Sequence, residues 1–336
     1  MNSTRLLHLI KTFDIGGVER STINSSNQLV NRIDFVGIFA HKGIFNHSNI
    51  VKSKVSQFYS IGKLSNPLFF VINLIMMFRI IICNKINIIN YHQRVLIPYI
   101  LFIRLFSPTI KIVYSHHNIF NDSLNNFLKA DIYLAFSIAL KHDLEKVSKS
   151  PIVLLNHKID IIENRSSINE TINVIGYVGR FEKLKGIYLL LDAFINISNE
   201  FSNLNLVIIG DGKEKSAIKK YIAQCNIVNK VIVKDPEIDL AEIYKGIDCL
   251  VVPSGKKEGF GLVIIEAMGN KIPVVASDLE PFKEIIKNNI TGLLFERGKV
   301  ESLIIQLNRV ITDNKLRTDI IRNGFEYVSK YFKMGV

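Results

Sequence analysis

The sequence predicts an α/β fold with two domains, and three observations support this prediction. Short apolar strands alternate with periodic helices along the chain, the pattern of sheets covered by helices. The 336 residues suffice for two ordinary cores, and 48% of them are hydrophobic. The polar segment 163–171 divides the pattern into two halves and is the predicted linker.

The first domain is placed at 1–160. It begins with a strand near 5–10, followed by Gly16 and Gly17 and a helix over about 18–30. The bare backbone of the two glycines can approach a phosphate or an acceptor closely, although a tight structural turn is the alternative. Further strands are predicted near 35–39, 86–90, 110–115, 132–136 and 152–155, with helices between them.

The second half predicts strands near 172–178, 204–209, 230–233, 248–252, 273–276 and 292–295. Arg180 follows the first of these strands, and Lys185 precedes a helix over 187–197. Because open α/β sheets bind ligands at the carboxyl ends of their strands, both cations can reach one crevice. Together they suit a diphosphate, whereas the alternative is a pair of solvated surface cations.

A second anion signal surrounds the helix predicted from Leu262 onward. A glycine turn, with Gly259 and Gly261, precedes this helix and leaves the first helix amides available to an anion. Glu258 lies just before the turn, and Glu266 lies within the helix. The helix is apolar on nearly every face, so Glu266 needs a hydrogen-bonding partner. A sugar-nucleotide offers hydroxyls for carboxylates and a diphosphate for amides, while a capped core helix is the alternative.

The first domain carries most of the net positive charge and contains two long apolar runs. Residues 1–150 contain 17 Lys+Arg and 7 Asp+Glu, a net charge of +10 within the +12 of the whole chain. The same domain contains the apolar runs 68–83 and 95–106, which are too short and too interrupted by Arg79 and Arg104 for a transmembrane helix. Buried α/β helices are one interpretation of these runs, and reversible contact with an anionic membrane surface is the other.

The cysteines and the N-terminus indicate a cytoplasmic protein. Cys83, Cys225 and Cys249 have neither disulfide-framework nor metal-site spacing, and we expect reduced, packed thiols and no metal site. The first ten residues lead into a glycine loop without a signal-peptide cleavage pattern. We therefore expect a cytoplasmic protein. The basic first domain is also compatible with peripheral contact at the inner membrane.

The motifs taken together resemble glycosyltransferase family 4. The resemblance rests on Gly16-Gly17-Val18-Glu19, Gly179-Arg180 with Lys185-Gly186, Ile209-Gly210-Asp211-Gly212, Val252-Pro253-Ser254, Glu258-Gly-Phe-Gly with Glu266-Ala-Met, and Pro273-Val-Val-Ala-Ser277. It spans nearly the whole chain and is densest in the second half. The loop 254–258 departs from the pattern by being longer, with two additional lysines.

The resemblance implies a GT-B fold in which two Rossmann-like domains face across a cleft. It divides the second half into a donor-binding domain at 171–318 and a helix at 319–336 that crosses back to the first domain. It further implies retaining sugar transfer from a UDP- or GDP-linked donor to a glycan or lipid-linked saccharide, as in bacterial cell-surface polysaccharide synthesis, without a metal or other cofactor.

Site residues follow from the same resemblance. Arg180 and Lys185 are expected at the diphosphate, Glu266 at the ribose and Glu258 at the sugar. The backbone of Gly259, Phe260 and Gly261, with Gly16 and Gly17, completes the expected donor site.

The resemblance also selects a histidine in the first domain. His117 best matches the family histidine near the donor sugar, with His116 as the fallback and His92 as a weaker candidate at the acceptor side. Histidine can orient a sugar hydroxyl or assist proton movement, although a satisfied loop histidine is the alternative. Ser137 matches a cleft position but equally suits a helix N-cap.

Other classes of protein remain open at this stage. A sugar-nucleotide epimerase or a pyridoxal-phosphate-dependent phosphorylase can share the two-domain fold, but no lysine stands out as a Schiff-base residue. A non-catalytic sugar-nucleotide-binding subunit is a further alternative. A nucleic-acid-binding module ranks last, because no RNA-reading motif accompanies the basic charge.

Overall fold

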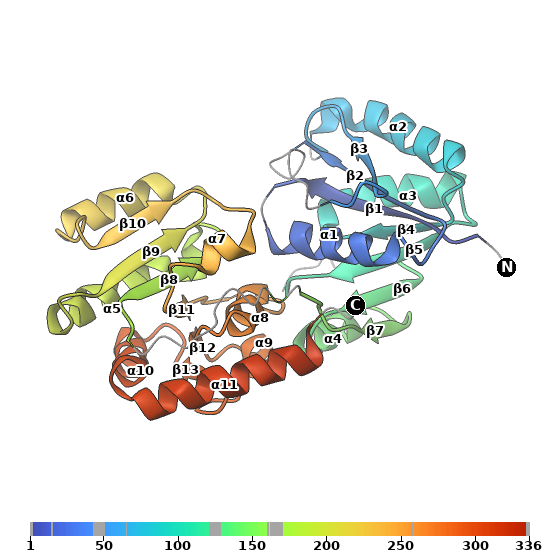
Figure 1. Ribbon diagram of the computed structural model, residues 1–336. Coiled ribbons are helices and arrows are strands. Elements are labelled where there is room, and N and C mark those ends of the chain that lie inside the picture. The colour runs from blue at the N-terminus through green and yellow to red at the C-terminus, as the bar shows by residue number, and fades with distance from the viewer. Residues whose placement is uncertain are drawn as a thin grey trace. The chain divides into compact units, whose positions relative to one another are not determined.

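The computed structural model describes residues 3–14, 16–42, 51–64, 66–120, 129–159, 161, 171–256 and 258–333. The chain separates into two compact units, Met1–His157 and Lys158–Val336. Each unit contains its own parallel sheet covered by helices, which confirms the predicted two-domain α/β fold (Figure 1). The linker residues 163–170 lie outside the described residues, and the finer boundaries at 1–160, 171–318 and 319–336 stay predictions.

Seven parallel strands form the first sheet, in the order β3-β2-β1-β4-β5-β6-β7. The sequence pattern does not predict β3, because Ser56-Gln-Phe-Tyr59 has two polar residues followed by two adjacent aromatic ones and so lacks alternation. The strands are β1 (Arg5–Thr12), β2 (Phe35–His41), β3 (Ser56–Tyr59), β4 (Ile88–Tyr91), β5 (Lys111–His116), β6 (Ile132–Ala135) and β7 (Ile152–Leu154).

Helices cover the first sheet unequally. The helices are α1 (Gly17–Leu29), α2 (Phe70–Cys83), α3 (Ile97–Phe106) and α4 (Ile138–Glu145), with short 3-10 turns at Pro67–Phe69 and Arg94–Leu96. Met77 of α2 and Ile100 of α3 belong to the same core as Leu7 and Leu9 of β1. The opposite face of β1, which presents Leu6 and His8, faces α1.

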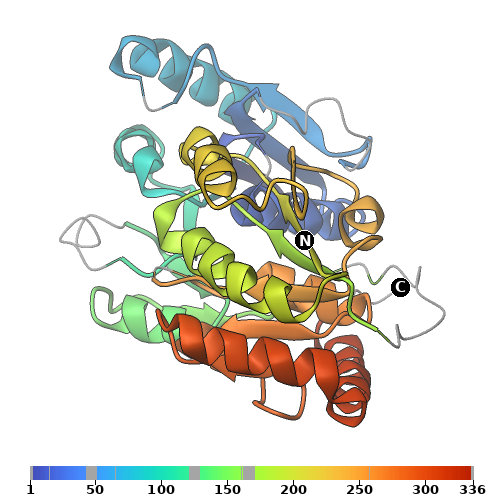
Figure 2. The ribbon, with the colours of Figure 1, turned by 90° about the vertical axis from the view of Figure 1, so that its left-hand side faces the viewer.

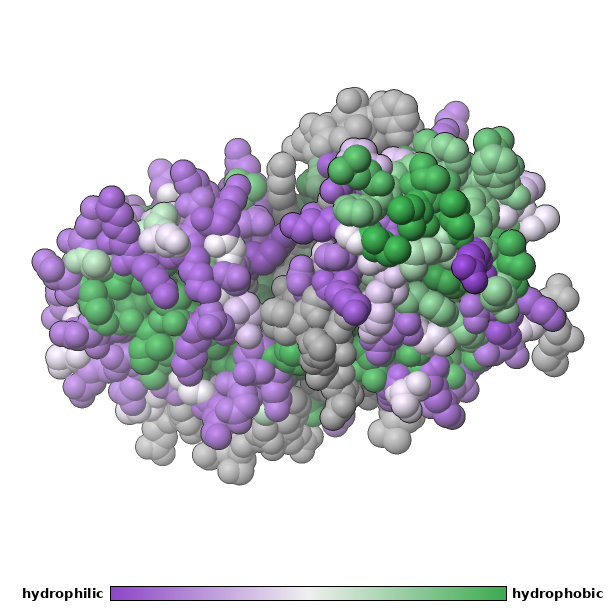
Figure 3. All heavy atoms as spheres, turned by 90° about the horizontal axis from the view of Figure 1, so that it is seen from above, coloured by the Kyte–Doolittle hydropathy of each residue, from purple (hydrophilic) through white to green (hydrophobic). Residues whose placement is uncertain are grey.

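The outer faces of α2 and α3 are apolar and exposed. We call this surface the α2–α3 patch, and Figure 3 shows the hydrophobic side chains gathered on the face of the first unit that carries it. Its helices meet through the ring pairs Phe70–Phe102 and Phe78–Phe106. The patch comprises Leu68, Val71, Ile72, Ile75, Ile82, Leu101, Phe102, Leu105 and Phe106.

These two helices therefore lack the polar outer face of most surface helices. They bury one apolar face in the core and expose another. Among the described residues, no helix is long and apolar enough to cross a membrane.

Cys83, at the end of α2, is exposed, so the expectation that all three thiols are packed is wrong for this residue.

Six parallel strands form the second sheet, in the order β10-β9-β8-β11-β12-β13. Alternate residues of β8, β9, β11, β12 and β13 belong to two different cores, so both faces of the sheet are buried along these strands, whereas edge strand β10 contributes to one core only. The strands are β8 (Val174–Val178), β9 (Asn205–Ile209), β10 (Val231–Lys234), β11 (Cys249–Val252), β12 (Val274–Ser277) and β13 (Leu293–Phe295).

Helices cover both faces of this sheet. α5 and α10 pack side by side on one face (Figure 2), and α8 packs on the other, where it also contacts α11. The predicted crossing of the last helix to the first domain stays a prediction. The elements are a 3-10 turn at Lys183–Lys185, α5 (Ile187–Glu200), α6 (Lys215–Gln224), α7 (Leu240–Tyr244), α8 (Leu262–Gly269), α9 (Glu280–Lys283), α10 (Val300–Thr312) and α11 (Asn314–Tyr331).

Candidate functional site

The centre of the second sheet brings the predicted residues to one edge. β8 and β11 are neighbours, although β9 and β10 lie between them in sequence, so the direction of winding reverses between these two strands. Open α/β sheets bind ligands at such a switch point, beyond the carboxyl ends of the strands. Arg180 and Lys185 follow β8, and Glu258 follows β11.

Lys185 and Glu258 form an ion pair at this edge. Lys185 Nζ lies 2.5 Å from Glu258 Oε1, and the two side chains are 23% and 13% exposed. Ser254 Oγ donates a second hydrogen bond to the same carboxylate oxygen, at 2.6 Å. The ammonium has three donors, so Lys185 can hold Glu258 and still donate to further oxygens. Partial burial strengthens the attraction between these groups relative to a surface pair.

The turn that carries Lys185 fits closely against the loop after β11. Gly255 N donates to Leu184 O at 2.8 Å. Gly186 has a left-handed backbone with φ of 72°, and a Cβ added there would lie 1.9 Å from Pro253 O. Glycine is therefore required at this position, because only a bare backbone can approach the loop this closely. The contact places Lys185 within reach of Glu258.

Arg180 does not join the ion pair. Its side chain is 58% exposed, and Nη1 lies 3.3 Å from Glu182 Oε1. An exposed pair of this kind contributes little to stability. The carbonyl of Arg180 accepts a hydrogen bond from the Tyr177 hydroxyl at 2.9 Å, which fixes the backbone at the end of β8. The side chain of Arg180 thus lies at the predicted edge of the sheet, and its ion pair with Glu182 is weak.

The glycine turn before α8 has the expected geometry. Gly261 is the N-cap residue and has a left-handed backbone with φ of 109° and ψ of 56°. Phe260 is only 7% exposed, and its ring packs 5.7 Å from that of Phe332. Its side chain therefore belongs to the core, so only its backbone is available to the predicted donor site.

Glu266 is buried and has a partner within the chain. Its side chain lies in the second turn of α8 and is 4% exposed. The hydroxyl of Tyr244, from α7, donates to Glu266 Oε2 at 2.9 Å. This bond supplies part of the compensation that burial of a carboxylate requires. A carboxylate has several acceptor positions, of which the Tyr244 hydroxyl uses one.

In the first unit, Gly16 and Gly17 begin α1. Gly16 is the N-cap and has extended backbone. A Cβ added at Gly16 would lie 2.4 Å from Glu19 Oε2, which is the end of a flexible side chain. Gln93 Nε2 donates to the other oxygen of Glu19 at 3.2 Å. The helix start is thus occupied by its own carboxylate, which an incoming anion would have to displace.

His117 is half-buried and lies beside several buried histidines. It follows β5, and its Nε2 lies 2.9 Å from Nδ1 of His92, which follows β4. His92 Nε2 in turn lies 3.0 Å from Nδ1 of His8 in β1. The ring of His117 stacks on Phe136, and Phe136 stacks on His157. The structure thus joins His117 and His92, which were predicted separately, and adds His8 and His157.

His116 and Ser137 have structural roles. His116 Nε2 lies 2.9 Å from Asp143 Oδ2, and both side chains are buried. The Ser137 side chain accepts a hydrogen bond from Leu140 N at 3.1 Å and caps α4, which is the alternative interpretation of this residue. Neither group is directed at a ligand by these contacts.

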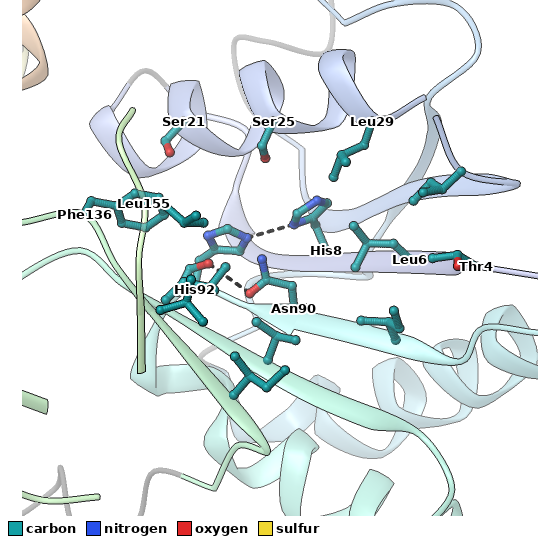
Figure 4. A pocket seen from close by; sticks show the side chains of 17 residues that line it. Thr4, Leu6, His8, Ser21, Ser25, Leu29, Asn90, His92, Phe136 and Leu155 are labelled. Atoms are coloured by element: carbon teal, nitrogen blue, oxygen red, sulfur yellow. Dashed lines mark hydrogen bonds between the residues drawn. The ribbon is translucent and has the colours of Figure 1, made fainter. Parts of the chain in front are cut away.

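A cavity opens beside the histidines, between α1 and the face of the first sheet that α1 covers. Its volume is about 430 Å³, and its lining is mainly aliphatic. Figure 4 shows His8 and His92 projecting into this space below Ser21 and Ser25 of α1. His8 Nε2 is buried and has no hydrogen-bond partner among the described residues.

Comparison with a protein-family model gives a match over residues 158–327, to the family described as "Glycosyl transferases group 1". The matched segment contains every predicted residue of the second unit. It covers the two centre strands, the ion pair and the helix that carries Glu266.

Curated relatives match parts of this chain. A capsular polysaccharide biosynthesis glycosyltransferase, CapM of Staphylococcus aureus, is 32% identical over 161 residues, which are 47% of this chain and 42% of CapM. A lipopolysaccharide 1,2-N-acetylglucosaminetransferase of Salmonella typhimurium is 28% identical over 233 residues, 63% of this chain and 61% of the relative. The chain spans about half the length of the curated relatives it matches.

Solved structures resemble the whole chain in fold. The Anabaena protein Alr3699/HepE, in complex with UDP and glucose, has a TM-score of 0.83 at 19% identity and covers 98% of this chain and 96% of its own. Sucrose-phosphate synthase from Thermosynechococcus elongatus has a TM-score of 0.82 at 19% identity, with coverages of 98% and 95%. These likenesses confirm the predicted GT-B fold.

Proposed function

Because the chain belongs to the group 1 glycosyl transferases, we propose that it is a retaining enzyme of glycosyltransferase family 4. In this proposal it moves a sugar from a nucleotide diphosphate-sugar to a glycan or lipid-linked saccharide. The second domain binds the donor, and the first domain presents the acceptor. Bacterial capsule or lipopolysaccharide synthesis is the setting that the names of the relatives suggest.

The observation that carries the proposal is the Lys185–Glu258–Ser254 cluster at the switch point of the second sheet. A diphosphate leaving group gains negative charge as the glycosidic bond breaks, and a preorganised ammonium stabilises that charge. Glu258, which neutralises Lys185 in the unliganded protein, becomes available to a sugar hydroxyl when the diphosphate takes the ammonium. The cluster thus suits a ligand with both an anion and hydroxyls.

The remaining donor contacts follow from position. Arg180 is mobile enough to fold over the diphosphate, since its own ion pair is exposed. The backbone of Gly259, Phe260 and Gly261 offers amides at the start of α8. Glu266 would accept hydrogen bonds from the ribose hydroxyls.

The first domain would complete the site. Gly16 and Gly17 offer the start of α1 to the donor, which requires Glu19 to move aside. His117 would hold a hydroxyl of the transferred sugar. These assignments make Glu258, His117, Arg180 and Lys185 the groups closest to the reacting atoms.

The donor nucleotide is proposed to be UDP or GDP, since both present the same diphosphate to Lys185. HepE, which shares the fold, was solved with UDP and glucose. Lys185, Arg180 and the α8 amides supply positive potential at the leaving group, so the proposed reaction uses no metal or other cofactor.

The first product should keep the donor's anomeric configuration, as the resemblance to family 4 implies. Turnover should survive a chelator, because the proposed site neutralises the leaving group with Lys185 and Arg180. NMR of the initial product from a panel of UDP- and GDP-sugars with saccharide acceptors would read the anomer directly. An inverted anomer, or activity lost in chelator and restored only by manganese or magnesium, would contradict the retaining, metal-free mechanism.

The same assay separates the alternatives. An epimerase would convert the nucleotide-sugar to its epimer without an acceptor. A non-catalytic binding subunit would bind the donor but form no product with any acceptor in the panel.

The α2–α3 patch supports a lipid-linked acceptor at a membrane surface. Nine exposed apolar side chains form it, and residues 1–150, to which the patch belongs, carry a net charge of +10. Stable but reversible binding to a leaflet needs two signals, and an apolar face with basic charge supplies both. Each Lys or Arg near an anionic surface contributes about 1 kcal/mol. We propose that this patch holds the enzyme at the inner leaflet.

The protein should co-sediment with anionic vesicles and leave them as salt rises, because the basic contribution is screened. Ile75→Glu should weaken this binding by placing a charge in the patch. Ile305→Glu is the matched control, since Ile75 and Ile305 are 56% and 57% exposed and Ile305 lies on α10 of the second unit. Equal binding of both variants, or no preference for anionic over neutral vesicles, would leave a soluble acceptor as the better hypothesis.

A further inference from the structure

Three imidazoles of the first unit, two buried and one half-buried, form an uninterrupted row. His8 Nδ1 faces His92 Nε2 at 3.0 Å, and His92 Nδ1 faces His117 Nε2 at 2.9 Å. Figure 4 shows the first of these links. Both ring nitrogens of His92 take part in these links, whereas His8 and His117 each contribute one nitrogen and have a second one outside the row. We call His8, His92 and His117 the histidine row.

The rings are aligned for hydrogen bonding along the row. The ring centroids of His8 and His92 lie 5.2 Å apart, and so do those of His92 and His117. Each centroid separation exceeds its N···N distance by about the sum of two imidazole ring radii. The line between the nitrogens therefore runs nearly through both ring centres, along the direction in which an imidazole N–H points.

Thr22 lies beside this row and does not interrupt it. Its hydroxyl donates to Val18 O at 2.8 Å. Its oxygen lies at nearly equal distances from the two nitrogens of His92, 3.3 and 3.5 Å. A group so placed is at the side of the ring or above it and lies on neither N–H axis, so it does not compete for the protons of the row.

The three rings are neutral near pH 7. Burial lowers the pKa of His8 to about 4. Burial, with the neighbouring His8 and His117, holds the pKa of His92 well below its ordinary value. Burial, with His157 and His116, does the same for the pKa of His117. Each neutral ring carries one proton on one of its two nitrogens.

Counting protons leaves only two arrangements. Two of the three protons occupy the two N···N links, and the third must stand at one end. Either all three rings carry the proton on Nδ1, so that His117 ends the row as a donor, or all three carry it on Nε2, so that His117 ends it as an acceptor. The tautomers of the three rings therefore change together.

The intrinsic chemistry of histidine selects between the two. Neutral histidine ordinarily favours the Nε2–H tautomer, and the row adds this preference over three rings. Either arrangement leaves one unpartnered nitrogen at His8, in the cavity lining, so that end does not reverse the preference.

We propose that His8 and His92 are positioning residues that hold His117 as its Nε2–H tautomer. His117 then presents Nδ1 as a hydrogen-bond acceptor, and this nitrogen has no hydrogen-bond partner within the described part of the chain. The tautomer assignment stands on the row alone. Its use, accepting a hydrogen bond from a hydroxyl of the transferred sugar, rests on the proposed function.

Nitrogen-15 NMR of the unliganded full chain tests the assignment. We expect His8, His92 and His117 all to be protonated on Nε2, with scalar couplings across both N–H···N links. A ring of His117 protonated on Nδ1, or the absence of both couplings, would overturn the proposal. This readout needs neither donor nor acceptor, so it decides the row even if the chain transfers no sugar.

Kinetic variants test the consequence for the reaction. His92→Phe should lower kcat/KM by up to about tenfold, the effect of one poorly held hydrogen bond. His92→Gln should recover part of the loss, because its amide oxygen can accept from His117 Nε2–H. His157→Phe removes a buried histidine that stacks near His117 but makes neither of the two N···N links, so it should keep both the tautomer and the rate. Equal losses of kcat/KM in His92→Phe and His157→Phe would show that the histidine row acts only through packing. If His92→Phe does not fold, the nitrogen-15 spectrum of the wild-type protein decides the proposal.

Discussion

Replacing Lys185 with alanine is expected to lower kcat/KM about 10²- to 10³-fold while the fold stays intact. This is the range measured when a single preorganised group that stabilises transition-state charge is removed. Lys185 stands in a partly buried cluster with Glu258 and Ser254, so its ammonium is already positioned before the donor arrives. Most of the loss should fall on kcat, because the diphosphate gains charge as the bond breaks.

Lys183→Ala is the matched control for this prediction. Lys183 belongs to the same 3-10 turn and is exposed, so its removal changes the net charge equally at nearly the same place. Steady-state kinetics with the identified donor and acceptor should give near wild-type values for Lys183→Ala. Equal losses in the two variants would show that only general surface charge matters, and the diphosphate role of Lys185 would have to be abandoned.

The two sheets could be predicted because their strands are fully buried or half-buried runs separated by turn residues. Twelve of the strands correspond to predicted segments within a few residues, and β3 does not. β7 and β13 are shorter and also lie at sheet edges, so length and position do not explain the difference. β3 reads Ser56-Gln-Phe-Tyr59, with its two aromatic residues adjacent and no apolar run or alternation to identify a strand.

The apolar helices show what hydropathy alone leaves open. The run 68–83 is apolar on nearly every face, which suggests a buried helix or a membrane-facing one equally well. The sequence cannot show which face the sheet covers. In the structure Met77 is buried while Ile75 is 56% exposed, so α2 is neither a fully buried helix nor a polar-faced one.

The candidate site was predictable in residue types but not in pairings. Lys185 and Glu258 are 73 residues apart, and only the strand order that makes β8 and β11 neighbours brings them together. The partner that Glu266 requires, Tyr244, carries no motif signal. His8 has none either, because a histidine within a buried strand is typical of a satisfied core residue; its link to His92 depends on the pairing of β1 with β4.

Gly186→Ala should destabilise the second domain by about 2–3 kcal/mol and strongly lower activity. The left-handed backbone at φ of 72° costs an alanine about 1 kcal/mol or more. The added Cβ would also lie 1.9 Å from Pro253 O, a backbone atom that cannot move aside as a side-chain end can. The turn and the loop must therefore separate, which draws Lys185 away from Glu258.

Gly255→Ala in the same loop is the control for this separation. A Cβ at Gly255 would lie 3.7 Å from Leu184 O, an ordinary van der Waals distance. Thermal unfolding should show a fall of several degrees in Tm for Gly186→Ala and little change for Gly255→Ala. Because the strain acts on the geometry of the ion pair, activity at a temperature where both variants are folded should fall only for Gly186→Ala. A Gly186→Ala protein with wild-type Tm and kcat/KM would mean that the close approach of the two loops is not needed to assemble the Lys185–Glu258 pair.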